Sequence, residues 1–153
     1  MTPTPSATAG DEVRILPARL PEDLDLVRQL FRAYAQALGV DLGFQDFEAE
    51  LAGLPGKYAS PRGCLLLAWR GDEAIGCIAL RPIDDERCER KRLYLRPDIR
   101  GGGLGRRLAA RICDEARAAG YRRICLDTLP SMAAARALYS DLGFTPTAPY
   151  VYN

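Results

Sequence analysis

Residues 93–107 join the end of a strand, a glycine-rich turn and the start of a helix, and this junction constrains the fold more than any other segment. The apolar strand pattern stops at Pro97, and an apolar helical face begins at Leu104 and repeats every fourth residue. A strand that feeds a helix in this way predicts a parallel strand-helix-strand unit, here over 89–127, with a right-handed connection. The glycine turn is then expected at the carboxyl end of a central strand, where open sheets bind ligands.

The turn reads Arg-Gly-Gly-Gly-Leu-Gly-Arg-Arg from Arg100 to Arg107. The first N–H groups of a helix have no partner within the helix and carry partial positive charge, and glycines let the oxygens of a ligand approach them closely. The arginines add full positive charges, so the turn is suited to a phosphate or a pyrophosphate. It lacks the Gly-Lys-Ser/Thr end of the Walker pattern, and Arg106 stands where the dinucleotide fingerprint requires its last glycine. A glycine-rich surface turn before an ordinary helix is the alternative interpretation.

The composition indicates one globular domain with its own core. The 153 residues are 48% hydrophobic and 27% charged with a net charge of +1, which argues against a disordered protein and against a bulk nucleic-acid binder. No apolar run is long enough for a membrane span and no signal-peptide pattern opens the chain, so we expect a cytoplasmic protein without membrane or nucleic-acid partners. Residues 1–11 are expected to form a flexible tail and residues 12–153 a single domain.

Cysteine and histidine usage restricts the possible chemistry. The five cysteines are odd in number and show no Cys-x-x-Cys spacing, so we expect reduced core residues, including Cys88 and Cys125, rather than disulfides or nucleophiles. The chain has no histidine, which excludes His-based triads and His-ligated zinc, and we expect no metal site. A general base would have to be a carboxylate, a water chain, a tyrosine or a cysteine.

The hydrophobic pattern predicts a mixed α/β domain. Strands are expected at 13–16, 64–69, 74–80, 89–96 and 124–126, with extended chain from 144, and helices at 21–38, 45–54, 104–119 and 133–142. The second and third strands should form a hairpin. Along the strand at 89–96, simple alternation predicts that Lys91, Leu93 and Leu95 share one face, opposite Arg90, Arg92 and Tyr94.

Two motifs in this order resemble the GNAT family of N-acetyltransferases. One is Arg-x-x-Gly-x-Gly at Arg100, Gly103 and Gly105, and the other is the segment 135–144, which is similar to the family's Ala-x-x-Leu-Tyr-x-x-Leu-Gly-Phe. The resemblance covers about 13–144 and implies the acyl-CoA N-acyltransferase fold: a central, mixed, twisted sheet with a parallel β-α-β cofactor unit and helices on both faces. Met132 stands where the family often has Asn. The sequence given has room for one strand after Gly143, so we expect the family's last strand to be either absent from it or replaced by a partner chain.

The resemblance also implies a site for acetyl-CoA as co-substrate. Tyr139 would protonate the leaving thiolate, and Glu89 would draw a proton from the amine, with Asp127 or a water relay as alternatives. Residues expected to bind the cofactor are Leu93, Tyr94, Leu95, Arg100, Gly101, Gly102, Gly103, Leu104, Gly105, Arg106 and Ala135. Tyr34, Phe44 and Tyr58 lie where this fold builds its acceptor pocket, although core or lid packing would equally explain each of them.

The predicted function is transfer of an acetyl group from acetyl-CoA to a primary amine by direct attack in a ternary complex. The acceptor would be a small-molecule amine or a peptide amine, and the protein a monomer or homodimer. The alternatives are an inactive acyl-CoA-binding or sensing domain and a protein-interaction module. Individual residues also have simpler interpretations: Tyr139 as a half-buried helix residue, Glu89 as a charge paired with Arg87 or Lys91, and the run 90–92 as a solvated strand edge or a phosphate contact.

Overall fold

The computed structural model describes residues 12–38, 44–99 and 102–125, without the side chains of residues 38 and 44–46. It forms a mixed α/β domain, as the sequence predicts, and the expected tail at 1–11 and the expected elements after 126 lie outside the described residues. In chain order the elements are β1 (Val13–Pro17), α2 (Leu24–Leu38), α3 (Phe44–Ala52), the 3-10 helix η1 (Gly56–Tyr58), β2 (Cys64–Arg70), β3 (Glu73–Pro82), β4 (Arg87–Leu95), the 3-10 helix η2 (Pro97–Ile99), α4 (Leu104–Ala118) and β5 (Arg123–Cys125).

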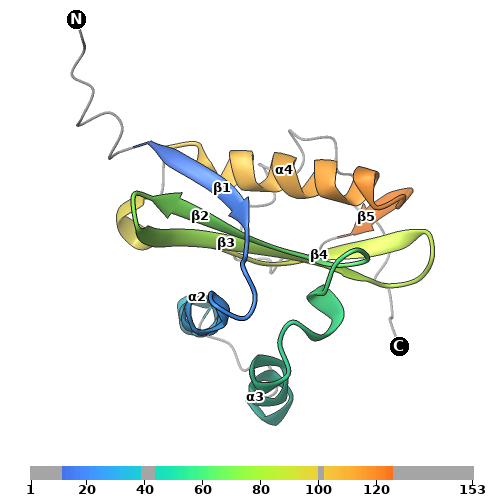
Figure 1. Ribbon diagram of the computed structural model, residues 1–153, viewed down its shortest axis with the longest axis horizontal. Coiled ribbons are helices and arrows are strands. Elements are labelled where there is room, and N and C mark those ends of the chain that lie inside the picture. The colour runs from blue at the N-terminus through green and yellow to red at the C-terminus, as the bar shows by residue number, and fades with distance from the viewer. Residues whose placement is uncertain (1–11, 39–43, 100–101, 126–153) are drawn as a thin grey trace, which may run out of the picture.

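The described strands form one mixed sheet in the order β1-β2-β3-β4-β5. Neighbouring strands are antiparallel except β4 and β5, which are parallel. The predicted β2–β3 hairpin and the parallel β4-α4-β5 unit are therefore both confirmed. Helix α4 covers one face of the sheet, and α2 and α3 cover the other (Figure 1). This arrangement brings the end of β4 and the start of α4 to the same edge of the sheet.

Each face of the sheet has its own apolar core. The pleat directs alternate side chains to opposite faces, so the continuous apolar runs of β2 and β3 contribute to both cores. On the α4 side the core contains Leu66, Ile78, Leu80, Leu108 and Ile112, among others. On the α2 and α3 side it contains Val27, Phe31, Leu51, Leu67 and Cys77, among others.

A β-bulge in β4 changes which face its side chains occupy. Lys91 pairs with Ala79 and Tyr94 pairs with Cys77, so three steps on β4 oppose two on β3, and Arg92 has a positive φ of 62°. The predicted alternation is wrong for this reason. Lys91, Arg92 and Tyr94 lie on the α2 and α3 side, because Ala79 and Cys77 belong to that core and Arg92 contacts rings from it.

The side chains of Arg90, Leu93 and Leu95 lie on the α4 side. Arg90 pairs with Leu80, and all of Leu80, Leu93 and Leu95 belong to the core under α4. Arg90 and Arg92 are both buried, so the expectation of a solvated strand edge is wrong for these two residues.

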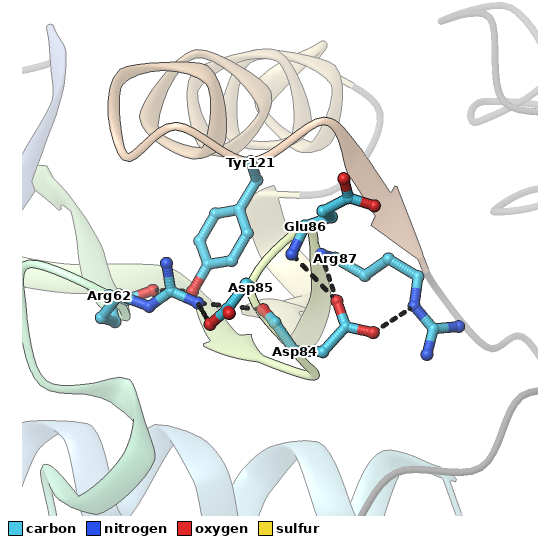
Figure 2. Close-up of polar contacts among 6 residues, drawn as sticks. All are labelled: Arg62, Asp84, Asp85, Glu86, Arg87 and Tyr121. Atoms are coloured by element: carbon cyan, nitrogen blue, oxygen red, sulfur yellow. Dashed lines mark hydrogen bonds and ion pairs between the residues drawn. The ribbon is translucent and has the colours of Figure 1, made fainter.

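The β3–β4 connection is shorter than the gap between the strands predicted at 74–80 and 89–96, because polar contacts close a turn over residues 83–86 (Figure 2). The Asp84 carboxylate accepts hydrogen bonds from the backbone N–H of Glu86 at 3.0 Å and of Arg87 at 2.8 Å, and from Arg87 Nε at 2.8 Å. An Asp side chain that bonds backbone N–H groups two and three residues later stabilises a tight turn. Strands β3 and β4 therefore extend to Pro82 and from Arg87.

The same turn is tied to two other segments. Tyr121, between α4 and β5, donates a hydrogen bond from its hydroxyl to the Arg62 carbonyl at 2.8 Å, and the Arg62 guanidinium lies 4.6 Å from the centre of its ring. Arg62 in turn donates to the Asp84 carbonyl at 2.9 Å (Figure 2). These contacts fix the start of β4, at the opposite end of the strand from the glycine turn.

Helix α2 begins at Leu24 rather than at Pro21, because residues 21–23 form a turn. The buried Asp23 carboxylate accepts hydrogen bonds from the Arg19 backbone N–H at 2.8 Å and from its guanidinium at 3.1 and 3.2 Å. Burial works to raise the pKa of Asp23, but the bonds from Arg19 outweigh it and place the pKa below its usual value. The carboxylate therefore anchors the chain just before the first helical turn.

Candidate functional site

The end of β4 leads through a single turn of 3-10 helix into α4. The Arg96 N–H donates to the Ile75 carbonyl at 2.9 Å, which continues the β3–β4 pairing by one residue, and the Ile99 N–H donates to the Arg96 carbonyl at 3.0 Å. Arg100 and Gly101 lie outside the described residues. The chain is described again at Gly102, and α4 begins at Leu104.

Gly103 is the N-cap of α4 and adopts a left-handed conformation with φ of 84° and ψ of 1°. It provides no side-chain cap for the helix, and a Cβ built on it would meet no atom of the described residues within 4 Å. Among the described residues, a Cβ on Gly102 would meet the Ile99 carbonyl at 3.8 Å and nothing closer. The first amides of α4 therefore have no capping side chain from Gly103, and they lie at the positive end of the helix dipole. This is the geometry that an anion requires at a helix N-terminus.

The arginines of the turn have different surroundings. Arg106 is exposed, as a phosphate contact would require. Arg107 instead donates to the Val13 carbonyl of β1 at 3.2 Å, so its charge is directed to the neighbouring strand. The side chain of Leu104 is buried in the core under α4, so only its backbone is available to a ligand.

The last residues of β4 divide between the two faces. Leu93 and Leu95 pack into the core under α4, and Tyr94 is half-buried on the opposite face. Within the described residues, β5 pairs with β4 over Arg87–Glu89, at the start of β4, so residues 93–95 lie beyond that pairing. Their backbone leads directly towards the glycine turn.

Glu89 is buried inside β4, with 2% of its surface exposed. Its Oε1 accepts a hydrogen bond from Arg81 Nε at 3.0 Å, and the two residues are cross-strand neighbours on β3 and β4. The expected partner Arg87 instead pairs with Asp84 at 2.8 Å. Glu89 is therefore a carboxylate held in place by an arginine, within the sheet rather than at a strand end.

Arg92, which the sequence did not single out for a role of its own, is held by an acidic partner and by aromatic rings. Its guanidinium donates to both oxygens of Glu50 in α3, at 2.9 and 3.2 Å, which is a bidentate pair. The guanidinium also lies 5.4 to 6.0 Å from three ring centres, those of Phe31, Tyr34 and Phe47. The sequence does carry a signal for this residue. It is the run of four charged residues at 89–92, which lies inside a predicted strand that follows two apolar strands.

Two of the three predicted acceptor residues lie beside this arginine. Tyr34 is half-buried with its ring 5.5 Å from the Arg92 guanidinium. Tyr58 is 3% exposed and packs edge-on against Phe31 with ring centres 5.9 Å apart. Its hydroxyl has no hydrogen-bond partner within the described residues, and burial raises its pKa, so the hydroxyl stays protonated. Phe44 begins α3, and its side chain lies outside the described part.

Tyr139, Ala135 and Asp127 lie outside the described residues. The five cysteines are free thiols, and burial raises the pKa of Cys88 to about 12, which leaves it unreactive. Within residues 12–38, 44–99 and 102–125, no cluster of three or more His, Cys, Asp or Glu side chains is arranged to hold a metal ion, and none of the helices has the length and apolarity that crossing a membrane requires.

Comparisons with known proteins identify relatives of this chain. The sequence profile of the Acetyltransferase (GNAT) family matches residues 24–144. An uncharacterized N-acetyltransferase of Schizosaccharomyces pombe is 41% identical over 145 residues, covering 92% of this chain and 88% of that protein. One from Dictyostelium discoideum is 27% identical over 193 residues, covering 86% and 89%.

Solved structures share the fold. A protein of Clostridium acetobutylicum described as a predicted acetyltransferase, in complex with acetyl-CoA, superposes with a TM-score of 0.78 over 93% of this chain and 96% of that chain, at 18% identity. The fold match, the family profile and the relatives lead to one conclusion: this chain is an acetyltransferase of the GNAT family.

Proposed function

We propose that the protein transfers an acetyl group from acetyl-CoA to a primary amine by direct attack in a ternary complex. The observation that carries this proposal is the junction of β4 and α4, where the left-handed Gly103 leaves the first amides of α4 without a side-chain cap. In a GNAT acetyltransferase these amides, with the Arg106 side chain, suit the pyrophosphate of acetyl-CoA. Arg100, Gly101, Gly102, Leu104 and Gly105 complete the proposed turn.

The backbone of Leu93, Tyr94 and Leu95 would bind the pantetheine arm as an added half-strand. These residues lie at the end of β4, beyond the described pairing with β5 and next to the turn that would hold the pyrophosphate. Ala135 is proposed to contact the same arm from the segment outside the described residues. The cofactor would therefore lie along one edge of β4, with its reacting end towards the middle of the strand.

The reaction needs no protein nucleophile, because a thioester is already activated. A neutral amine attacks the thioester carbonyl, a C–N bond forms, and the C–S bond breaks with release of the thiolate. Holding the two reactants together can lower the barrier by ~7–11 kcal/mol. We propose that Tyr139 gives its proton to the thiolate. Glu89 is buried in β4, where Arg81 holds its carboxylate in place. We propose that this carboxylate takes the amine proton through water.

Replacement of Tyr139 by Phe tests the proposed acid. We expect Tyr139→Phe to lower kcat by about 10²-fold, because an acid that protonates a leaving group contributes ~10²–10⁴-fold in rate, while acetyl-CoA affinity stays within about twofold. Amine acetylation is followed by mass spectrometry at saturating acetyl-CoA, and affinity by calorimetry. Tyr121→Phe is the control, because that hydroxyl bonds the Arg62 carbonyl at the far end of β4. Equal turnover by Tyr139→Phe and the wild type would remove the acid role.

A further inference from the structure

The end of β4 lies very close to the backbone of β3. Gly76 of β3 pairs with Leu95, and a Cβ on Gly76 would lie 2.9 Å from the Tyr94 carbonyl oxygen and 2.9 Å from Leu95 Cδ2. A real Cβ essentially never comes this close to another atom, so a glycine is what allows the two strands to approach each other here. The close approach falls on two of the residues whose backbone is proposed to bind the pantetheine arm.

Arg96 extends this attachment beyond the end of β4 through both its backbone and its side chain. Its N–H donates to the Ile75 carbonyl at 2.9 Å, and its Nε donates to the Ala74 carbonyl at 2.9 Å. Pro97 follows and has no N–H, so the backbone of residue 97 cannot donate to β3, and the side chain of Arg96 supplies a donor instead. Hydrogen bonds from a charged donor are stronger than those from a neutral one. Arg96 is therefore attached to two consecutive carbonyls of β3.

The same residue begins the turn that leads to α4. The Arg96 carbonyl accepts a hydrogen bond from the Ile99 N–H at 3.0 Å, which closes the 3-10 helix η2. Ile99 packs against the core under α4, and Leu104, the first residue of α4, is buried in that core. Arg96 therefore marks the point where the chain leaves β3, and its attachment sets where the turn begins relative to the sheet.

Ion pairs at the surface join the same two segments. Glu73, at the start of β3, pairs with Arg70 at 3.1 Å and lies 3.9 Å from the Arg96 guanidinium, and Arg70 lies 3.9 Å from Asp98 of η2. These side chains are partly exposed, so each pair adds little stability by itself. They do show that the Arg96 guanidinium is directed to the β2–β3 hairpin. This direction favours a positioning role for Arg96 over a direct contact with a phosphate.

We propose that Arg96 is a positioning residue for acetyl-CoA, which fixes the end of β4 relative to the N-terminus of α4. This inference rests on the proposed binding of the pantetheine arm along β4 and of the pyrophosphate at the turn. A ligand held at two places gains affinity from the second contact only when the two places have the right separation. Arg96 lies between the two, directly after Leu95 and before the residues that lead into α4.

A comparison of CoA with ADP tests the proposal, because CoA carries the pantetheine arm and the pyrophosphate whereas ADP carries only the nucleotide part. Affinities are measured by calorimetry for CoA and by NMR titration for ADP, well below the Tm of each variant. Arg96→Met should raise Kd for CoA about tenfold and change Kd for ADP less than about twofold, because the contacts of the pyrophosphate itself remain. Unchanged affinity for CoA would overturn the proposal, as would equal losses for CoA and ADP.

Further variants separate the hydrogen bond of Arg96 from its charge. Arg14→Met is the matched control, because Arg14 of β1 also donates to a backbone carbonyl of the β2–β3 hairpin, that of Gly71 at 3.3 Å, and it should leave both affinities unchanged. Arg96→Lys keeps the positive charge but loses the Nε donor, so its affinity for CoA should stay close to that of Arg96→Met. Recovery of the wild-type affinity by Arg96→Lys would overturn the proposal.

Gly76→Ala tests the same idea from β3. Its Cβ would displace the Tyr94 backbone, so we expect Kd for CoA to rise about tenfold while Kd for ADP stays within about twofold of the wild type. A folded Gly76→Ala protein with the wild-type affinity for CoA would contradict the claim that the placement of the end of β4 controls cofactor binding.

The wild-type protein separates this inference from the proposed function. Equal binding of CoA by the wild type and by Arg96→Met would show that the cofactor assignment is right and the role of Arg96 wrong. Failure of the wild type to bind either CoA or ADP would overturn the proposed cofactor site, and the role of Arg96 with it.

Discussion

The side chain of Arg92 is buried between an acidic partner and three aromatic rings, because the bulge in β4 turns it under α2 and α3. Its side chain is 8% exposed and that of its partner Glu50 is 20% exposed. At this depth the removal of one partner leaves a buried charge without compensation, which costs far more than the loss of a surface pair. The Glu50–Arg92 pair therefore helps to fix the position of α3 on the sheet.

Glu50→Gln measures this cost. We expect a loss of about 3 kcal/mol in the free energy of unfolding, because Arg92 keeps its charge without a carboxylate, and hence a Tm lower by about 6–12 °C. Glu48→Gln is the control on the same helix, since the Arg32–Glu48 pair is 51% and 41% exposed. Its loss should stay within about 0.5 kcal/mol. Equal losses in the two variants, by thermal or urea unfolding, would show that Arg92 is not confined as described.

At the level of elements, the 3-10 helix η1 places Tyr58 beneath α2, and Gly63 holds η1 against the start of β2. A Cβ on Gly63 would lie 2.4 Å from the Lys57 carbonyl oxygen and 2.5 Å from the Tyr58 carbonyl carbon. No real Cβ approaches backbone atoms this closely. The close approach fixes the position of Tyr58 against Phe31 and near Arg92.

Gly63→Ala is therefore expected to displace η1. The overpacked backbone should cost about 1–3 kcal/mol of stability, and a shift of η1 should also raise KM for the amine acceptor without changing acetyl-CoA affinity. Gly102→Ala is the stability control, because its Cβ would meet no atom of the described part of the chain closer than 3.8 Å. A Gly63→Ala protein with the wild-type Tm and the wild-type KM would contradict this account of η1.

At the scale of the whole molecule, the sheet separates the glycine turn from a set of buried charged side chains. The glycine turn lies at the edge where β4 meets α4, and the Arg81–Glu89 and Glu50–Arg92 pairs lie under α2 and α3. Strand β4 contributes to both, since its last residues lead into the turn and its middle residues carry the charges. The proposed ternary complex would need such an arrangement, because both reactants would have to reach the same stretch of one strand.

The local pattern of the sequence was sufficient to predict the sheet order around the β2–β3 hairpin, the parallel β4-α4-β5 unit and the glycine turn before Leu104. It did not predict the bulge, because Arg92 takes a positive φ without the glycine that usually marks one. Nor did it predict the Glu50–Arg92 pair, whose members are 42 residues apart and meet only when α3 packs on β4. Polar partners across such distances depend on tertiary packing, which no local pattern specifies.

The central claim is that the turn before α4 binds acetyl-CoA, and thermal unfolding with and without ligand tests it most directly. A ligand that binds only the folded state at a hundredfold excess over Kd stabilises it by about 2.7 kcal/mol, which raises Tm by about 5–11 °C in a chain of this size. NAD is the control ligand. Gly103→Asp is the matched variant, because Asp tolerates a positive φ and its carboxylate would repel the pyrophosphate.

We predict a clear rise in Tm with acetyl-CoA, no rise with NAD, and loss of the acetyl-CoA effect in a folded Gly103→Asp protein. If acetyl-CoA shifted the wild type no more than NAD, or shifted Gly103→Asp as much as the wild type, the turn would not be the acetyl-CoA site.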